Sequence, residues 1–98
     1  MNKKMKLKIK ANHRGFHYAE FQDRYSNKCS IQISSLADDR CIWLGIDEPE
    51  CKIMTNEGWQ PYDIPAQVSV PTRMHLNQEQ VKMLLPLLQR FAETGKID

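Results

Sequence analysis

Residues 74–95 read MHLNQEQVKMLLPLLQRFAETG, and this stretch decides the fold because its local signals all predict one helix over residues 78–94. Asn77 is a suitable N-cap residue, and Gln80 stands three positions later, as a capping box requires. Gly95 is a typical helix end. Pro86 removes one backbone donor, so we expect a bend there. Apolar residues recur at helical spacing and form one stripe: Val81, Leu84, Leu85, Leu88, Phe91 and Ala92.

Alternating and apolar segments before this helix predict β-strands. We expect an α+β fold, with an antiparallel sheet of about four or five strands and the C-terminal helix packed on one face. The strands should lie near residues 4–10, 16–22, 29–34, 41–46 and 67–75. Residues 52–54 suggest at most a short strand, and residues 58–65 a loop between prolines.

The alternation over residues 29–34 assigns side chains to the two faces of the sheet. Cys29, Ile31 and Ile33 should face the core, with Ser30, Gln32 and Ser34 on the outside. The segment 41–46 is more continuously apolar, as expected of a central strand covered on both faces. The expected core consists of Ile31, Ile33, Ile42, Leu44, Leu85, Leu88 and Phe91.

The length of 98 residues indicates one domain, with residues 1–10 as a Lys-rich strand or tail and residues 11–98 as the α+β domain. No apolar run approaches the about 18 residues of a membrane span, and no apolar segment of a signal peptide follows the lysines. Three cysteines without a C-x-x-C pair predict free thiols. We therefore expect a cytoplasmic protein without disulfides.

The net charge of +2 is unevenly distributed along the chain. Residues 1–10 contribute +5, so residues 11–98 sum to −3. The lysines suit an edge strand or solvated tail, or alternatively an arm that binds nucleic acid. A cluster of acids between Asp38 and Glu57 would repel a phosphate backbone. The arm would use Lys3, Lys4, Lys6, Lys8 and Lys10.

No recognised catalytic motif occurs in the chain: it lacks a Gly-rich phosphate loop, H-E-x-x-H and G-x-S-x-G. His13 and His17 are four residues apart, but their region predicts a turn and a strand, so they do not share a helix face. His75 precedes the helix without a nucleophile signature that would support a hydrolase. We expect no enzymatic activity, no catalytic residue, no metal site and no cofactor.

Six residues from loops and strand ends are candidate binding groups, because aromatic rings and fork-shaped cations suit both protein anchoring and phosphate or base recognition. Trp59 and Tyr62 have two alternatives, since they could instead plug the end of the core. The candidates are Arg24, Tyr25, Trp59, Tyr62, Arg73 and His75.

The order of several segments across residues 15–95 resembles a group of small uncharacterised phage, prophage and bacterial proteins. The matching segments include Asp23-Arg24-Tyr25, Ile42-Trp43-Leu44-Gly45-Ile46-Asp47 and the pattern RMHLxxEQVxxLLP that begins at Arg73. The group has no established activity and assigns no site residues. The resemblance implies an accessory protein in the host cytoplasm, of the kind that inhibits host factors, including defence systems, or traps their ligands.

Two functional hypotheses follow. The first is a non-enzymatic phage-type binding protein, as a homo-oligomer, that inhibits a host defence factor or sequesters a small nucleotide-like ligand. The alternative is a nucleic-acid-binding accessory protein that uses the Lys-rich start with Phe16, Tyr18 and Tyr25 as stacking groups on an exposed sheet. Neither hypothesis involves a membrane.

Overall fold

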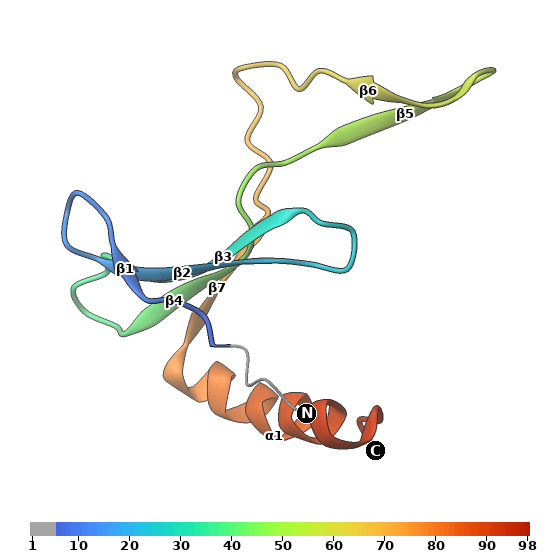
Figure 1. Cartoon of the computed structure of the whole chain (residues 1–98). Helices are drawn as coiled ribbons and strands as arrows, with labels where there is room; N and C mark the ends of the chain where they lie inside the picture. Colours follow the sequence, from blue (N-terminus) through green and yellow to red (C-terminus); the bar gives the residue numbers. More distant parts are fainter. Residues whose placement is uncertain (1–5) are drawn as a thin grey trace.

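The computed structural model describes residues 6–98 and has an antiparallel sheet, a separate hairpin and one C-terminal helix (Figure 1). The α+β prediction is therefore confirmed. The elements are β1 (Lys10–Ala11), β2 (His17–Gln22), β3 (Lys28–Ile33), β4 (Cys41–Ile46), β5 (Cys51–Thr55), β6 (Gly58–Tyr62), β7 (Arg73–Asn77) and α1 (Gln78–Thr94).

The main sheet has five antiparallel strands in the order β1-β2-β3-β4-β7. The strand predicted near 4–10 is much shorter than expected: β1 consists of Lys10–Ala11, and residues 6–9 form no strand. Residues 1–5 of that prediction lie outside the described part of the chain. The strand predicted near 67–75 begins later, since β7 starts at Arg73.

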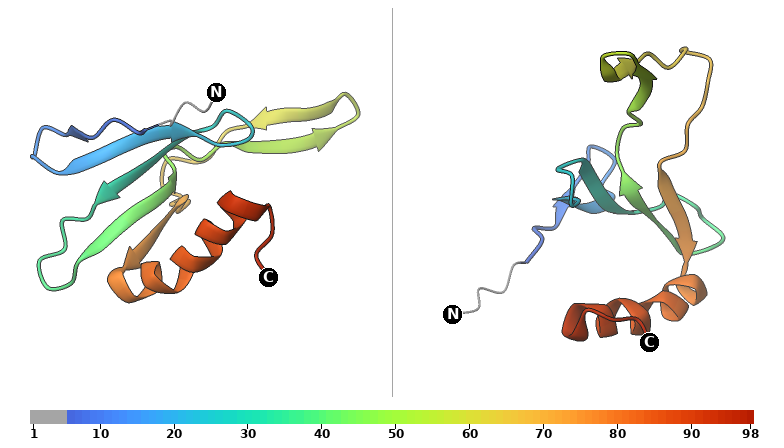
Figure 2. Two further views of the ribbon diagram at one scale, coloured as in Figure 1. Left: turned by 60° about the horizontal axis from the view of Figure 1, so that its bottom comes forward. Right: turned by 90° about the vertical axis from the view of Figure 1, so that its right-hand side faces the viewer.

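Between β4 and β7 the chain leaves the sheet and forms the β5–β6 hairpin, which projects away from the main sheet (Figures 1 and 2). The prediction of a loop over 58–65 is wrong here, because β6 pairs with β5 from Gly58 to Tyr62. Pro61 obscured this strand in the sequence. It is tolerated because β6 pairs on one side, so the missing donor can face the free edge.

The strand register separates the side chains of the main sheet by chemistry. Ile31 pairs with Leu44, which pairs with Met74, and these side chains share an apolar face. One position along, Gln32 and His75 flank Trp43 on the opposite, polar face. The predicted alternation over residues 29–34 is thus present, but the predicted burial is wrong at three positions, because Ile33 is exposed whereas Ser30 and Ser34 are buried.

The ends of α1 follow the predicted capping pattern. The Asn77 side chain accepts from the Gln80 N–H at 2.9 Å, and the Gln80 side chain accepts from the Asn77 N–H at 2.9 Å. Gly95 adopts the left-handed conformation, with φ of 78°, and donates its N–H to the Phe91 carbonyl. The helix continues through Pro86.

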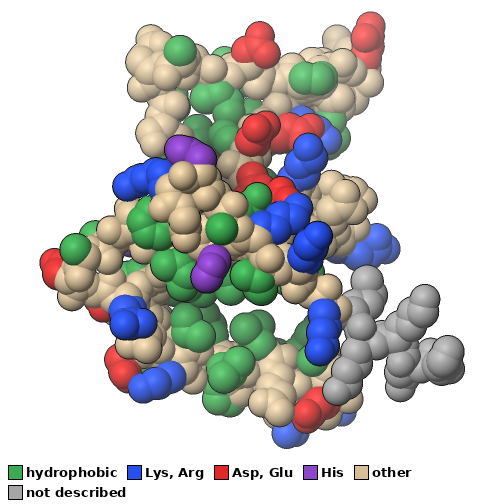
Figure 3. All heavy atoms as spheres, turned by 60° about the vertical axis from the view of Figure 1, so that its left-hand side comes forward, with side chains coloured by type: hydrophobic (Ala, Val, Ile, Leu, Met, Phe, Trp, Pro, Cys, Tyr) green, Lys and Arg blue, Asp and Glu red, His purple; other side chains and the backbone are tan. Residues whose placement is uncertain are grey.

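The apolar stripe of α1 is not packed against the sheet as predicted. Leu85, Leu88 and Phe91 are 55%, 57% and 58% exposed, and no side chain of the helix is buried. The physical reason is the connection: β7 ends at Asn77 and α1 begins at Gln78, so no loop allows the helix to fold back onto the sheet. Figure 3 shows hydrophobic side chains around the hollow that remains between helix and sheet.

The expected core is consequently incomplete in the single chain. Among residues 6–98, the buried hydrophobic residues are Ala19 and Cys29. Ile31, Ile42 and Leu44 are half-buried, whereas Ile33 is exposed.

Gly45 permits β7 to approach β4 at the start of their pairing. Its φ is +150°, and a Cβ there would lie 2.5 Å from the Thr72 carbonyl oxygen and 2.9 Å from the Arg73 Cα. Gly45→Ala should therefore lower the free energy of unfolding by about 1–3 kcal/mol, measured by urea denaturation. Gly15→Ala is the matched control, because Gly15 has a φ of +86° with nothing within 4 Å of its Cβ position. Equal losses in the two variants would contradict the role of the close approach.

Candidate functional site

The polar face of the main sheet contains a compact group of side chains, here called the sheet-face cluster: Ser30, Gln32, Trp43, Arg73 and His75. Strands β3, β4 and β7 are adjacent in the sheet, and the register pairs Gln32 with Trp43 and Trp43 with His75. Ser30 and Arg73 both pair with Gly45, which has no side chain to separate them, and the Arg73 guanidinium lies 3.5 Å from the Ser30 hydroxyl. Three strands thus hold this cluster on a hydrogen-bonded framework.

Arg73 has neutral partners within the cluster. Its Nη1 atom donates to Gln32 Oε1 at 3.3 Å and to Ser30 Oγ at 3.5 Å, and its guanidinium carbon lies 5.4 Å from the Trp43 ring centroid. The ion pairs formed within residues 6–98 are Lys10–Glu20 and Glu79–Lys82. The Arg73 guanidinium therefore has no carboxylate partner in this part of the chain, and its charge is available to an anion.

His75 lies flat on Trp43. The two ring centroids are 3.9 Å apart with an interplanar angle of 7°, and His75 Nε2 is 2.9 Å from Ser34 Oγ. That hydroxyl also accepts from the Leu36 N–H at 3.2 Å. The imidazole is thus oriented by a stack on one side and a hydrogen bond at its edge.

Ser30 and Ser34 are the buried polar residues of the described chain, at 4% and 8% exposure, although both belong to the outward face. Ser34 is hydrogen-bonded to His75, and Ser30 accepts from Arg73 and donates to Asp47 Oδ1 at 2.5 Å. The larger polar side chains therefore cover the two serines. This covering makes the face a packed polar layer, whose groups are oriented before any ligand arrives.

A cavity of about 270 Å³ adjoins the cluster. Lys10 Nζ lies 3.0 Å from Glu20 Oε1, and this hydrogen bond and the carboxylate charge raise the pKa of Lys10. The pair offsets the Glu20 charge at the rim, so the other charged groups that line the cavity are Arg73 and Asp47, whose carboxylate accepts from Ser30. The cavity is lined by Tyr18, Glu20, Ser30, Gln32, Asp47 and Arg73.

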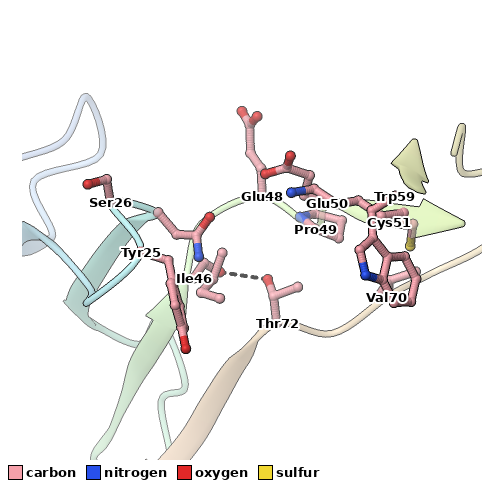
Figure 4. A pocket seen from close by; sticks show the side chains of 12 residues that line it. Tyr25, Ser26, Ile46, Glu48, Pro49, Glu50, Cys51, Trp59, Val70 and Thr72 are labelled. Carbon is pink, nitrogen blue, oxygen red and sulfur yellow. Dashed lines mark hydrogen bonds between the residues drawn. The ribbon is translucent and has the colours of Figure 1, made fainter. Parts of the chain in front are cut away.

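The structure brings together two of the six residues predicted for binding, Arg73 and His75. Tyr25 and Trp59 instead line a separate, larger cavity of about 840 Å³ between the β2–β3 turn and the base of the hairpin (Figure 4). Arg24 and Tyr62 line neither cavity. The six candidate residues therefore do not all meet at one site.

The larger cavity is lined by the carboxylates of Glu48 and Glu50 and by Lys52, and it holds no arginine. Trp59 is 63% exposed and Tyr62 is also exposed, so neither residue plugs the end of a core. That alternative is wrong because the hairpin projects from the sheet instead of closing its end.

Sequence reasoning missed Trp43, Gln32 and Ser30 as site residues. Trp43 lies in the continuously apolar segment 41–46, which predicted burial on both faces. The alternation of side chains along this strand could have indicated its role. Trp43 lies on the same face as Gly45, and Gly45 marks the close backbone approach next to Arg73.

All three cysteines are free. Burial, together with the nearby Asp23 carboxylate, raises the pKa of Cys29. Burial and the Asp39 carboxylate likewise raise the pKa of Cys41, which opposes thiolate formation at neutral pH.

The surroundings of His75 differ from those of a catalytic histidine. The His75 ring contacts the buried Ser34 hydroxyl, but no carboxylate of residues 6–98 orients its other nitrogen as a catalytic triad would require. Within the same residues, no group of three or more His, Cys, Asp or Glu side chains is arranged to hold a metal ion. None of the helices in the described structure has the length and apolar character to cross a membrane.

Fold and site together define a small α+β protein with a cationic and aromatic cluster on one sheet face. Comparisons of the chain with models of protein families, with curated proteins and with solved structures found no match.

The β2–β3 turn, which presents Arg24 and Tyr25, depends on one carboxylate. Asp23 accepts from the Tyr25 and Asn27 backbone N–H groups at 2.9 Å and from Asn27 Nδ2 at 3.1 Å. The hydrogen bonds from Asn27 lower the pKa of Asp23 below its ordinary value of 3.8.

Because this pKa is lowered in the folded state, the turn should be stabilised above pH 3.8 and lose that stabilisation as the pH falls through the folded value. NMR should record a shift of the Asn27 amide resonance in that acidic range. Asp23→Ala should abolish this shift. A variant that retained it would show that another group is responsible.

Proposed function

We propose that this chain is a small non-enzymatic binding protein of phage type that sequesters a nucleotide-like ligand on the sheet-face cluster. The observation that supports this proposal is Arg73, which has no carboxylate partner among residues 6–98 and lies beside the stacked rings of Trp43 and His75. The resemblance to small phage proteins supports the same class.

The residue types of the cluster match the parts of a nucleotide. A guanidinium can donate two parallel hydrogen bonds to phosphate oxygens, which makes Arg73 the phosphate-binding group. The planar rings of Trp43 and His75 offer surfaces and edges for a base. Gln32 and Ser30 can donate to or accept from ribose hydroxyls and base edges.

Sequestration requires binding without chemistry, which agrees with a His75 that lacks an orienting carboxylate among the described residues. By lowering the free concentration of a nucleotide signal, such a protein would inhibit a host defence factor without touching it. The same protein would then act both as a trap for the ligand and as an inhibitor of the defence factor.

Arg73→Ala should weaken binding of a phosphate-containing ligand by about 10- to 100-fold, because a charge-assisted hydrogen bond contributes about 1.5–3 kcal/mol. Isothermal titration calorimetry with adenosine diphosphate and with a cyclic dinucleotide as probes would measure this change. Arg73→Lys should restore little of the affinity, since ammonium lacks the planar fork.

Arg24→Ala is the matched control for this titration, because Arg24 is an exposed arginine outside the cluster. Equal losses at Arg73 and Arg24 would contradict the proposed site. If neither probe bound the wild-type protein, the adenine-nucleotide form of the proposal would be wrong.

A second candidate is direct binding of a host protein through the β5–β6 hairpin. Both faces of this hairpin expose large side chains: Met54 pairs with Trp59 on one face, and Ile53 and Tyr62 lie on the other. An isolated two-stranded hairpin is only marginally stable in water, so a partner would stabilise it. Trp59→Ala should then abolish capture of that protein while Arg73→Ala leaves it intact, as measured by pull-down.

The nucleic-acid alternative has less support. Lys6 and Lys8 are exposed, Lys10 is paired with Glu20, and Lys3 and Lys4 lie outside the described residues. A single-stranded oligonucleotide added to the same calorimetric series tests it. Binding that weakens steeply with salt and disappears on deletion of residues 1–10 would favour this alternative over sequestration.

A further inference from the structure

The single chain exposes far more surface than a protein of its size requires. Its accessible surface is 9060 Å², whereas a folded monomer of the same mass, 11.5 kDa, exposes about 5,800 Å². Its radius of gyration is 16.7 Å, compared with about 13 Å for a compact chain of this length. Each chain therefore exposes about 3,000 Å² more surface than a compact monomer, and the projecting β5–β6 hairpin contributes to this excess.

Part of this surface is apolar and lies on two sides of one hollow, here called the wedge. The sheet contributes Ile33, Ile42 and Leu76, and the helix contributes Val81, to a cavity of about 380 Å³ that Arg40 and Lys82 also line. A second hollow of about 180 Å³, which also contains Ile33 and Ile42, extends the apolar surface toward β2. Figure 3 shows these hydrophobic side chains around the open space between sheet and helix.

We propose that the wedge is filled by helix α1 of a second copy of this chain, in a homodimer with twofold symmetry. A twofold interface must be self-complementary, and each chain supplies both an apolar helix stripe and an apolar sheet face. When each helix enters the other wedge, both surfaces are covered at once. Obligate homodimers bury about 2,000–5,000 Å² in total, which the excess of two chains can supply.

The chain's own helix cannot cover the sheet face. Helix α1 follows β7 directly, so the strand fixes the direction in which the helix leaves the sheet. The Asn77–Gln80 capping box stabilises this junction. A 17-residue helix is about 25 Å long, similar to the about 24 Å width of five paired strands. The helix of a second copy is joined to its own sheet and not to this one, so it is free to span this sheet.

The oligomeric state of the wild-type protein is the first test. Size-exclusion chromatography with light scattering should give the mass of a dimer or a multiple of it. The unfolding temperature should rise with protein concentration, because unfolding and dissociation are coupled in an obligate dimer. A monomer that unfolds at a temperature independent of concentration would overturn the proposal.

A pair of variants locates the interface. Leu88→Glu puts a charge in the apolar stripe and should weaken the dimer by about 100-fold or more, as expected for an unpaired charge in an interface. Met83→Glu is the matched control, since Met83 is exposed and lies outside the stripe on the other side of the helix. Equal dissociation by both substitutions would contradict the location.

Since Leu88→Glu could also unfold the chain, an isotope-filtered NMR measurement on wild-type protein gives the same information without a substitution. A mixture of labelled and unlabelled chains should show intermolecular NOEs between Leu88 methyls and those of Ile33 and Ile42. Intermolecular NOEs that map to the β5–β6 hairpin and spare the helix would overturn the wedge assignment.

Discussion

The pairing of β3, β4 and β7 is the constraint on which the rest of the structure depends. Its register places Ile31, Leu44 and Met74 on one face and Gln32, Trp43 and His75 on the other. A slip of one residue would exchange these faces and bury the polar groups among apolar ones. Gly45 allows the close contact at the start of this pairing, so a single position without a side chain supports both faces.

Within one chain, the side chains of the polar face are packed together, whereas those of the apolar face lack a covering layer. On the polar face, the side chains of the sheet-face cluster contact one another, and every buried side-chain polar atom of the described residues has a hydrogen-bond partner. On the apolar face, the hydrophobic groups remain exposed across the wedge. Ligand binding on one face and dimer formation on the other would thus proceed without competing for the same residues.

Helix α1 and strand β3 could be predicted from sequence because their signals are local. These signals are the Asn77 cap and Gly95 for the helix, and the alternation over 29–34 for the strand. The exposure of Leu88 could not be predicted, because it depends on the direct junction after β7, a geometric fact that helical periodicity does not encode. Arg73 could be predicted as a site residue from its side-chain chemistry alone. Trp43 could not, because its place beside Arg73 depends on the strand register.

The central claim is that the sheet-face cluster binds a small phosphate-containing ligand through Arg73. Native mass spectrometry after mixing the protein with a small-molecule extract of bacterial cells tests this claim most directly, because the ligand need not be known. We expect an adduct that is released on denaturation, has the mass of a nucleotide, and is absent from Arg73→Ala but present in Arg24→Ala. A wild-type protein that retains no adduct, or an adduct unaffected by Arg73→Ala, would contradict it.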